Sequence, residues 1–126
     1  MNDQEFDLLI SQAMDELPQA YIKGLDNVVI VYADKPSFEQ IQKMKIEDNQ
    51  LLLGLYEGIP LTQRGAEYNL VLPDKITLFK ESIMAVSRSQ SELFEQIKRT
   101  LWHEIAHYYG LSHDRMEYLQ ERRDKL

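Results

Sequence analysis

Cysteine is absent from this 126-residue sequence. Without a thiol the chain can form no disulfide and can offer no thiolate to a metal ion. A metal bound by this protein must therefore be held by nitrogen and oxygen atoms, with histidine and carboxylate side chains as the available ligands.

Positive charge is also scarce, because 14 lysines and arginines face 21 aspartates and glutamates and leave a net charge of −7. This balance argues against nucleic acid or an anionic membrane as a partner. The acidic N-terminus leads into an amphipathic segment, and the sequence shows neither a signal peptide nor an apolar run long enough to span a membrane. We therefore expect a cytoplasmic protein.

Repeats, low-complexity segments and interdomain linkers are absent as well, so residues 1–126 are expected to form a single domain with one hydrophobic core. Apolar residues at helical spacing predict a first helix. Pro18 ends this helix or begins a short second turn closed by Gly24. The apolar residues are Phe6, Leu9, Ile10, Ala13, Met14 and Leu17.

Three strands are expected next. The β-branched run at 28–32 is typical of a buried strand, residues 51–56 form a second strand, and residues 76–79 form a third after the turn signal at 73–74. A capping box of Ser37 and Gln40 predicts a short helix after the first strand. The connecting segments are a polar linker at 46–50, a loop at 61–69 and, at 70–72, either a short strand or the approach to the third strand.

A second capping box, Ser89 with Glu92, begins a longer helix. One face of this helix is apolar and is expected to pack on the sheet, and residues 114–125 suit a short charged terminal helix. The whole pattern predicts an α+β fold. The apolar face consists of Phe94, Ile97, Leu101, Ile105 and Tyr108.

The end of this helix carries the pattern H-E-x-x-H-x-x-G-x-x-H at residues 103–113. His103 and His107 lie four residues apart, roughly opposite the apolar face, so that two imidazoles can bind one ion. Glu104 is turned about 100° from His103 around the helix axis. It lies beside the ligands, where a carboxylate could take a proton from a metal-bound water.

Gly110 follows the second histidine by three residues, where a left-handed residue can stop a helix and turn the chain. Such a turn would bring His113 back as a third ligand. Three protein ligands leave a fourth position open, as in catalytic zinc sites. Two other interpretations are a surface helix with two solvated histidines and a glycine cap, and a bound metal without catalysis.

Beyond the motif, most of the chain resembles a known family. The segments L-G-L-Y-E-G-I-P-L-T-Q-R-G at 53–65 and L-P-D-K-I-T-L-F at 72–79, together with the motif helix, resemble the small bacterial family of minimal zincin-like metallopeptidases. The resemblance implies a compact α+β zincin-like domain, in which a small mixed sheet packs against an N-terminal helix and the active-site helix.

The resemblance also implies Zn²⁺ bound by His103, His107 and His113, with Glu104 as the general base. In the family that this chain resembles, the third ligand is either a histidine or an aspartate, so Asp114 stays an alternative to His113. The function expected from motif and resemblance together is zinc-dependent hydrolysis of peptide bonds in a peptide or protein substrate.

The alternative function is a non-catalytic metal-binding or protein-interaction module that retains the site. An enzyme would need, in addition to the metal, a hydrogen-bond donor that stabilises the developing oxyanion. Six residues are chemically able to act as that donor: Tyr56, Arg64, Tyr68, Tyr108, Tyr109 and Tyr118.

Overall fold

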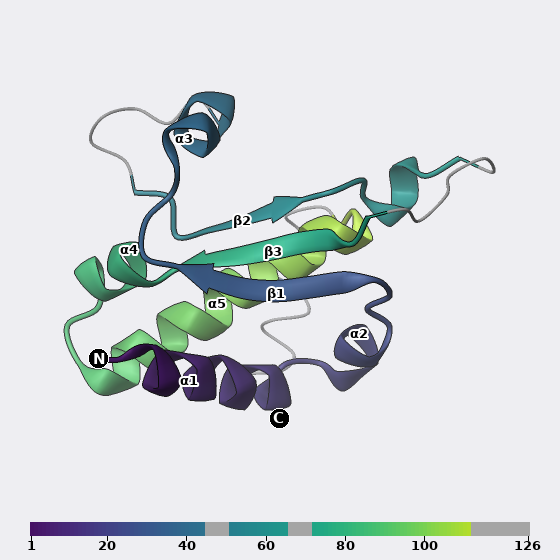
Figure 1. Ribbon diagram of the computed structural model, residues 1–126. Helices are drawn as coiled ribbons and strands as arrows, with labels where there is room; N and C mark the ends of the chain where they lie inside the picture. Colours follow the sequence, from purple (N-terminus) through teal and green to yellow (C-terminus); the bar gives the residue numbers. More distant parts are fainter. Residues whose placement is uncertain (45–50, 66–71, 112–126) are drawn as a thin grey trace.

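A computed structural model of the protein describes residues 1–44, 51–65 and 72–111 (Figure 1). Within these residues the fold is mixed α+β, as expected. The elements in chain order are α1 (Asp3–Glu16), α2 (Gln19–Lys23), β1 (Val28–Ala33), α3 (Phe38–Met44), β2 (Gly54–Glu57), the 3₁₀ turn η1 (Leu61–Gln63), β3 (Asp74–Phe79), α4 (Lys80–Ala85) and α5 (Gln90–Tyr109).

The strands form a small mixed sheet in the order β1-β3-β2. The central strand β3 pairs in parallel with β1, where Ile30 lies opposite Ile76, and antiparallel with β2, where Tyr56 lies opposite Ile76. The parallel pair needs a long crossover, and the chain between β1 and β3 contains α3, β2 and η1. The expected mixed sheet is therefore confirmed.

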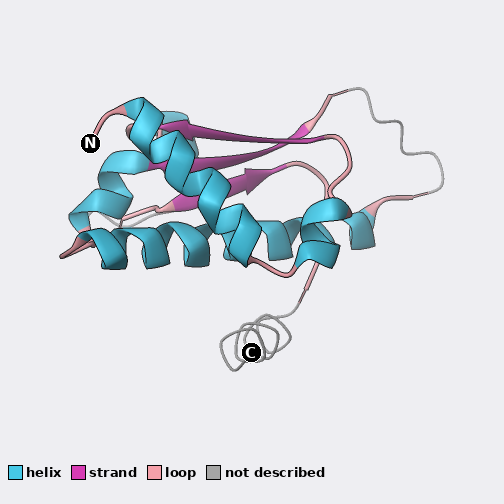
Figure 2. Cartoon of the chain, turned by 90° about the horizontal axis from the view of Figure 1, so that it is seen from below, coloured by secondary structure: helices cyan, strands magenta, loops and turns pink. Residues whose placement is uncertain are grey.

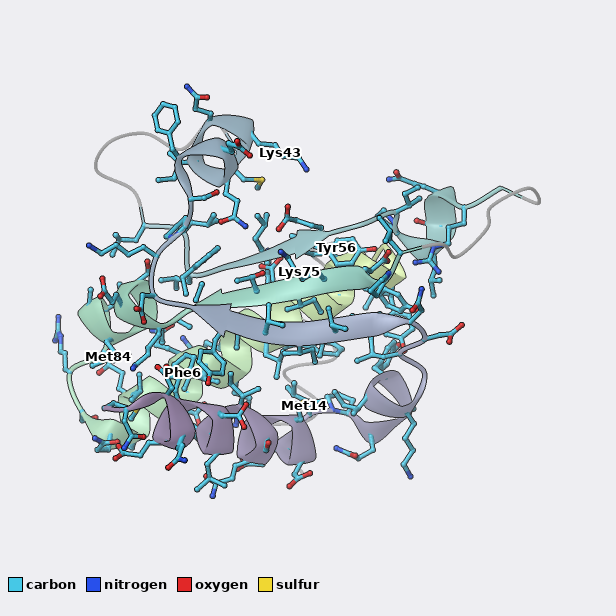
Figure 3. The ribbon with its side chains drawn as sticks, viewed as in Figure 1. Phe6, Met14, Lys43, Tyr56, Lys75 and Met84 are labelled. Atoms are coloured by element: carbon cyan, nitrogen blue, oxygen red, sulfur yellow. The ribbon has the colours of Figure 1, made fainter. Side chains whose placement is uncertain are left out.

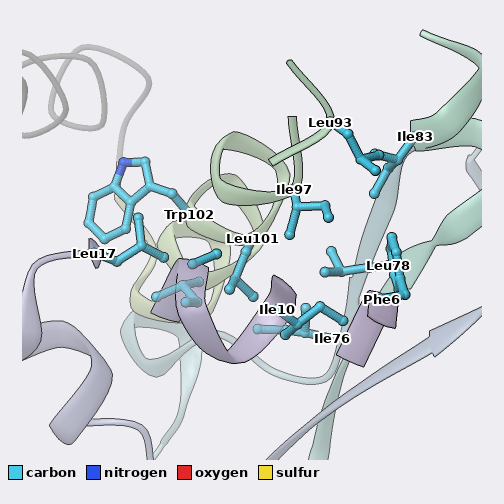
Figure 4. Packing of buried hydrophobic residues seen from close by; sticks show 12 residues of the cluster. Phe6, Ile10, Leu17, Ile76, Leu78, Ile83, Leu93, Ile97, Leu101 and Trp102 are labelled. Carbon is cyan, nitrogen blue, oxygen red and sulfur yellow. The ribbon is translucent and has the colours of Figure 1, made fainter. Parts of the chain in front are cut away.

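Helices α1 and α5 pack together with the sheet around one hydrophobic core (Figures 2 and 4). Phe6 points from α1 toward the sheet (Figure 3), and its ring makes an edge-on contact with Tyr32 at 5.7 Å between centroids. Burying each such aromatic or aliphatic side chain contributes about 1.5–3 kcal/mol. The fully buried residues of this core include Phe6, Leu17, Ile76, Leu78, Ile83, Ile97, Leu101 and Ile105.

The first strand is not buried as predicted. Val29 and Val31 of β1 are 40% and 37% exposed, whereas their neighbours in the strand are half-buried. β1 lies at the edge of the sheet, with one face against the helices. A continuous β-branched run suits both a buried strand and such a half-exposed one, and only the strand order distinguishes them.

Several boundaries also differ from the predictions. Strand β2 begins at Gly54 rather than 51, β3 begins at Asp74 within the expected turn, and η1 lies in the expected loop. The helix α4 is not predicted from the sequence; Lys80 anchors it to α1, with its Nζ 3.0 Å from Asp3 Oδ1. The expected linker at 46–50 and the terminal helix at 114–125 lie outside the described residues.

The serine of each predicted capping box caps its helix, and at Ser37 the reciprocal bond from the glutamine is also present. Ser37 Oγ accepts from Gln40 N at 3.1 Å, and Gln40 Oε1 accepts from Ser37 N at 2.9 Å. Ser89 Oγ accepts from Glu92 N at 3.1 Å at the start of α5. None of the helices in the described part of the chain has the length and apolar character needed to cross a bilayer.

Candidate metal centre

Helix α5 carries the candidate ligands and is held firmly against the core. Its predicted apolar face is buried at Ile97, Leu101, Ile105 and Tyr108, while Phe94 is half-buried. Trp102 is also buried. Because the packed face is fixed, the opposite side of the helix is presented in a defined orientation.

His103 and His107 lie side by side on α5. Their ring centroids are 4.4 Å apart with an interplanar angle of 67°, and both side chains are half-buried. Potential ligand atoms of His103, Glu104 and His107 all lie within 4.8 Å of one another. The structure thus brings together the two histidines predicted from their four-residue spacing.

Glu104 is more deeply buried than its position beside the histidines suggests. It is only 6% exposed, and its Oε1 lies 3.1 Å from Nδ1 of His107. This hydrogen bond raises the pKa of His107 above its usual value, although burial acts in the opposite direction. With Nδ1 bonded to the carboxylate, Nε2 is the ring nitrogen left for a metal ion.

Gly110 ends α5 in the left-handed conformation, at φ 71° and ψ 31°, as predicted. The turn is closed by Gly110 N donating to His107 O at 3.0 Å and by Leu111 N donating to Ala106 O at 3.0 Å. A Cβ on Gly110 would lie 2.3 Å from Thr62 Oγ1, so the residue also permits close contact with η1. His113 and Asp114, the two candidates for the third ligand, lie outside the described residues.

Gly110→Ala is therefore expected to lower the free energy of unfolding by about 1–3 kcal/mol, because a side chain there is strained and collides with Thr62. Urea denaturation would measure this change. Gly65→Ala is the matched control, since a Cβ there meets no atom of the described residues within 4 Å. Equal effects of the two substitutions would contradict the role assigned to Gly110.

The described residues form open hollows beside each of the two histidines. One, of about 300 Å³, is lined by His103, Glu104 and Thr100 of α5 and by residues 52–54 at the start of β2. β2 approaches α5 closely here because Gly54 has no side chain: a Cβ would lie 2.6 Å from Thr100 Cγ2. The other hollow, of about 370 Å³, lies between His107 and the segment that follows β2.

Three of the proposed oxyanion donors are bound elsewhere. The hydroxyl of Tyr108 is buried against the backbone of Asp26, and that of Tyr109 donates to Tyr21 O at 2.6 Å. Tyr56 donates its proton to Asp74, and burial together with this bond raises the pKa of Tyr56. Tyr68 and Tyr118 lie outside the described residues.

The sequence predicts Asp74 only as part of a turn and not as a buried ion-pair partner, yet it is only 3% exposed. Besides Tyr56, it binds Arg64, whose Nη2 lies 2.6 Å from Asp74 Oδ2. The only local signal is an acidic residue directly before an apolar strand, with Arg64 as the sole arginine in residues 51–75. Neither feature predicts that the two side chains meet.

Comparison with known proteins identifies a family for this chain. A family model described as zincin-like metallopeptidase matches residues 25–123. A search of the curated proteins gave no match to this sequence. Among solved structures, a conserved hypothetical protein from Thermus thermophilus is similar in fold, with a TM-score of 0.56 and 22% identity over 96% of this chain and 99% of that one. Because the family model covers most of the chain, this protein belongs to the zincin-like metallopeptidase family.

Proposed function

We propose that the protein is a zinc-dependent peptidase that hydrolyses peptide bonds with Glu104 as its general base. The observation that carries this proposal is the cluster of His103, Glu104 and His107, whose potential ligand atoms lie within 4.8 Å of one another on one helix. Membership of the family supports the same reaction class.

The residues of the cluster fit zinc. Imidazole nitrogens are among the preferred ligands of Zn²⁺, and a chain without cysteine can offer only nitrogen and oxygen. His103 and His107 would hold the ion, with His113 as the proposed third ligand and Asp114 as the alternative. A bound Zn²⁺ supplies a Lewis acid that acidifies water and polarises a carbonyl group.

Glu104 has the position required of a proton carrier. Its carboxylate is buried beside both histidines, where it can accept a proton from the attacking water and deliver it to the leaving amine. Its hydrogen bond to His107 Nδ1 also holds that ring in one orientation. The two hollows next to the cluster leave room for a substrate chain on either side of the histidines.

A peptide-library digest tests the proposal. The purified protein is loaded with zinc and incubated with a broad peptide mixture, with and without a chelator, and new termini are identified by mass spectrometry. Cleavage that stops on chelation and returns with zinc supports the proposal. A zinc-loaded protein that cleaves no peptide, even with cell lysate added to supply a partner, would favour a non-catalytic metal-binding module.

The third ligand can be identified by comparing two substitutions. If the turn at Gly110 delivers His113 to the metal, His113→Ala is expected to weaken zinc binding more than Asp114→Ala. Competition with a chromogenic chelator measures both affinities. The reverse order would identify the carboxylate as the ligand.

A further inference from the structure

An ion pair removed from water lies close to the candidate metal centre. Arg64 Nη2 is 2.6 Å from Asp74 Oδ2, and the two side chains are 11% and 3% exposed. Tyr56 donates its hydroxyl proton to the same carboxylate oxygen, and Arg64 Nε donates to Ile59 O at 2.8 Å. Burying such a pair contributes little to stability compared with apolar packing, so its presence calls for another explanation.

The network of Asp74, Arg64 and Tyr56 joins three parts of the chain. Asp74 begins β3, Tyr56 belongs to β2, and Arg64 follows η1. A Cβ on Gly58 would lie 2.3 Å from Asp74 Cγ, so the chain leaving β2 passes directly beside the carboxylate. The Arg64 guanidinium also lies 5.5 Å from the ring centroid of Tyr108, the residue after His107. The network therefore fixes the segment 58–64 relative to the last turn of α5.

This segment forms one wall of the hollow of about 370 Å³ beside His107. Pro60, Thr62 and Gln63 of this segment line the hollow together with Tyr56 of β2 and with His107, Gly110 and Leu111 at the end of α5. The wall presents hydroxyl, amide and apolar groups, while the charge of Arg64 is balanced by Asp74. Of the described residues that line the hollow, none is aspartate, glutamate, lysine or arginine, so this part of the lining favours an uncharged group over one that would be desolvated without a charged partner.

We propose that Asp74 and Arg64 are positioning residues. They hold the segment 58–64 against the end of α5, so that the hollow beside His107 accepts an uncharged substrate side chain next to the scissile bond. This inference rests on the proposed peptidase function. It adds a site for one substrate residue and the two residues that keep that site in shape.

Trypsin offers a readout that is independent of peptidase activity. In the wild type the Arg64 side chain is bound by Asp74 and Ile59 O, so trypsin should cut after Arg64 slowly. Asp74→Asn removes the charge that holds Arg64 and is expected to raise this cleavage rate at least about tenfold. Lys75→Gln is the matched control, because it removes an exposed ion pair with Glu57 from the same two strands. It should leave cleavage after Arg64 unchanged.

Kinetics then test the link to substrate recognition. With a peptide found in the library digest, Asp74→Asn is expected to raise KM about tenfold or more, with kcat within about threefold of the wild type and zinc content unchanged. Replacing each residue flanking the scissile bond by Glu or Lys should lower the wild-type kcat/KM at least about tenfold at one of these positions. The Asp74→Asn variant should lose most of this discrimination against a charged residue.

If Asp74→Asn fails to fold, the double substitution Asp74→Asn with Arg64→Gln leaves no unpaired buried charge and permits the same kinetic comparison. If trypsin cuts faster after Arg64 in Asp74→Asn, but KM and the discrimination against charged residues stay unchanged, the inference is overturned. The proposed peptidase function would remain intact. If the wild type cleaves nothing, the test is instead the affinity of the zinc-loaded Glu104→Gln protein for a peptide. Binding that Asp74→Asn weakens at least about tenfold supports the positioning role, and binding that it leaves unchanged, or no binding at all, overturns it.

Discussion

Glu104→Gln is expected to lower kcat for any cleaved peptide by about 10²–10⁴-fold, the usual contribution of a general base. Glutamine keeps the size of the side chain and an oxygen that can accept a hydrogen bond from His107 Nδ1, so the ring should keep its orientation. It cannot accept a proton from water at neutral pH. Zinc content by mass spectrometry and the melting temperature should therefore stay close to the wild-type values.

The matched control for this experiment lies on the same helix. Glu95→Gln makes the same chemical change on α5, at a side chain that is 50% exposed and paired with Lys98. It should leave kcat unchanged, since exposed ion pairs contribute little. Full activity of Glu104→Gln would show that the mechanism is wrong. Loss of zinc together with activity would instead assign Glu104 a role in holding the metal.

The double substitution His103→Ala, His107→Ala is expected to abolish zinc binding, from about one zinc per chain in the wild type. Loss of an outer-shell partner alone typically weakens metal binding about 10–100-fold, and the loss of two direct ligands must exceed that. Added zinc should raise the melting temperature of the wild type and not that of the variant, because only a ligand bound to the folded state stabilises it.

Arg99→Ala provides the control for the metal experiment. Arg99 is exposed, one turn before His103 on α5, and lines the same hollow as His103 and Glu104. This substitution should leave zinc content and the zinc-dependent melting shift unchanged. Zinc content that is the same in the histidine double variant and the wild type would refute the assignment of the metal site.

The features predicted correctly from the sequence are those that depend on neighbours in the chain. The pairing of His103 with His107 follows from helical periodicity, and the end of α5 follows from a glycine at the one place where a left-handed residue closes the helix. The serine caps at Ser37 and Ser89 are likewise interactions over three residues. Such signals are read from a short window and do not require the rest of the fold.

The features that escaped prediction depend on residues far apart in the sequence. β1 has the pattern of a buried strand, but the sheet order leaves Val29 and Val31 half-exposed at the edge. Tyr108 and Tyr109 are chemically able oxyanion donors, but the fold directs their hydroxyls to the backbone more than 80 residues away. Propensity and periodicity carry no information about these contacts.

The sequence by itself determined that His103 and His107 lie together on one helix, because their pairing follows from the spacing of residues one turn apart. Only the tertiary structure decided how deeply Glu104 is buried and that Asp74 meets Arg64 beside the end of α5. Burial and ion pairing between separate segments arise from the packing of β2, β3 and α5 against one another, and this packing has no counterpart in any local stretch of the chain.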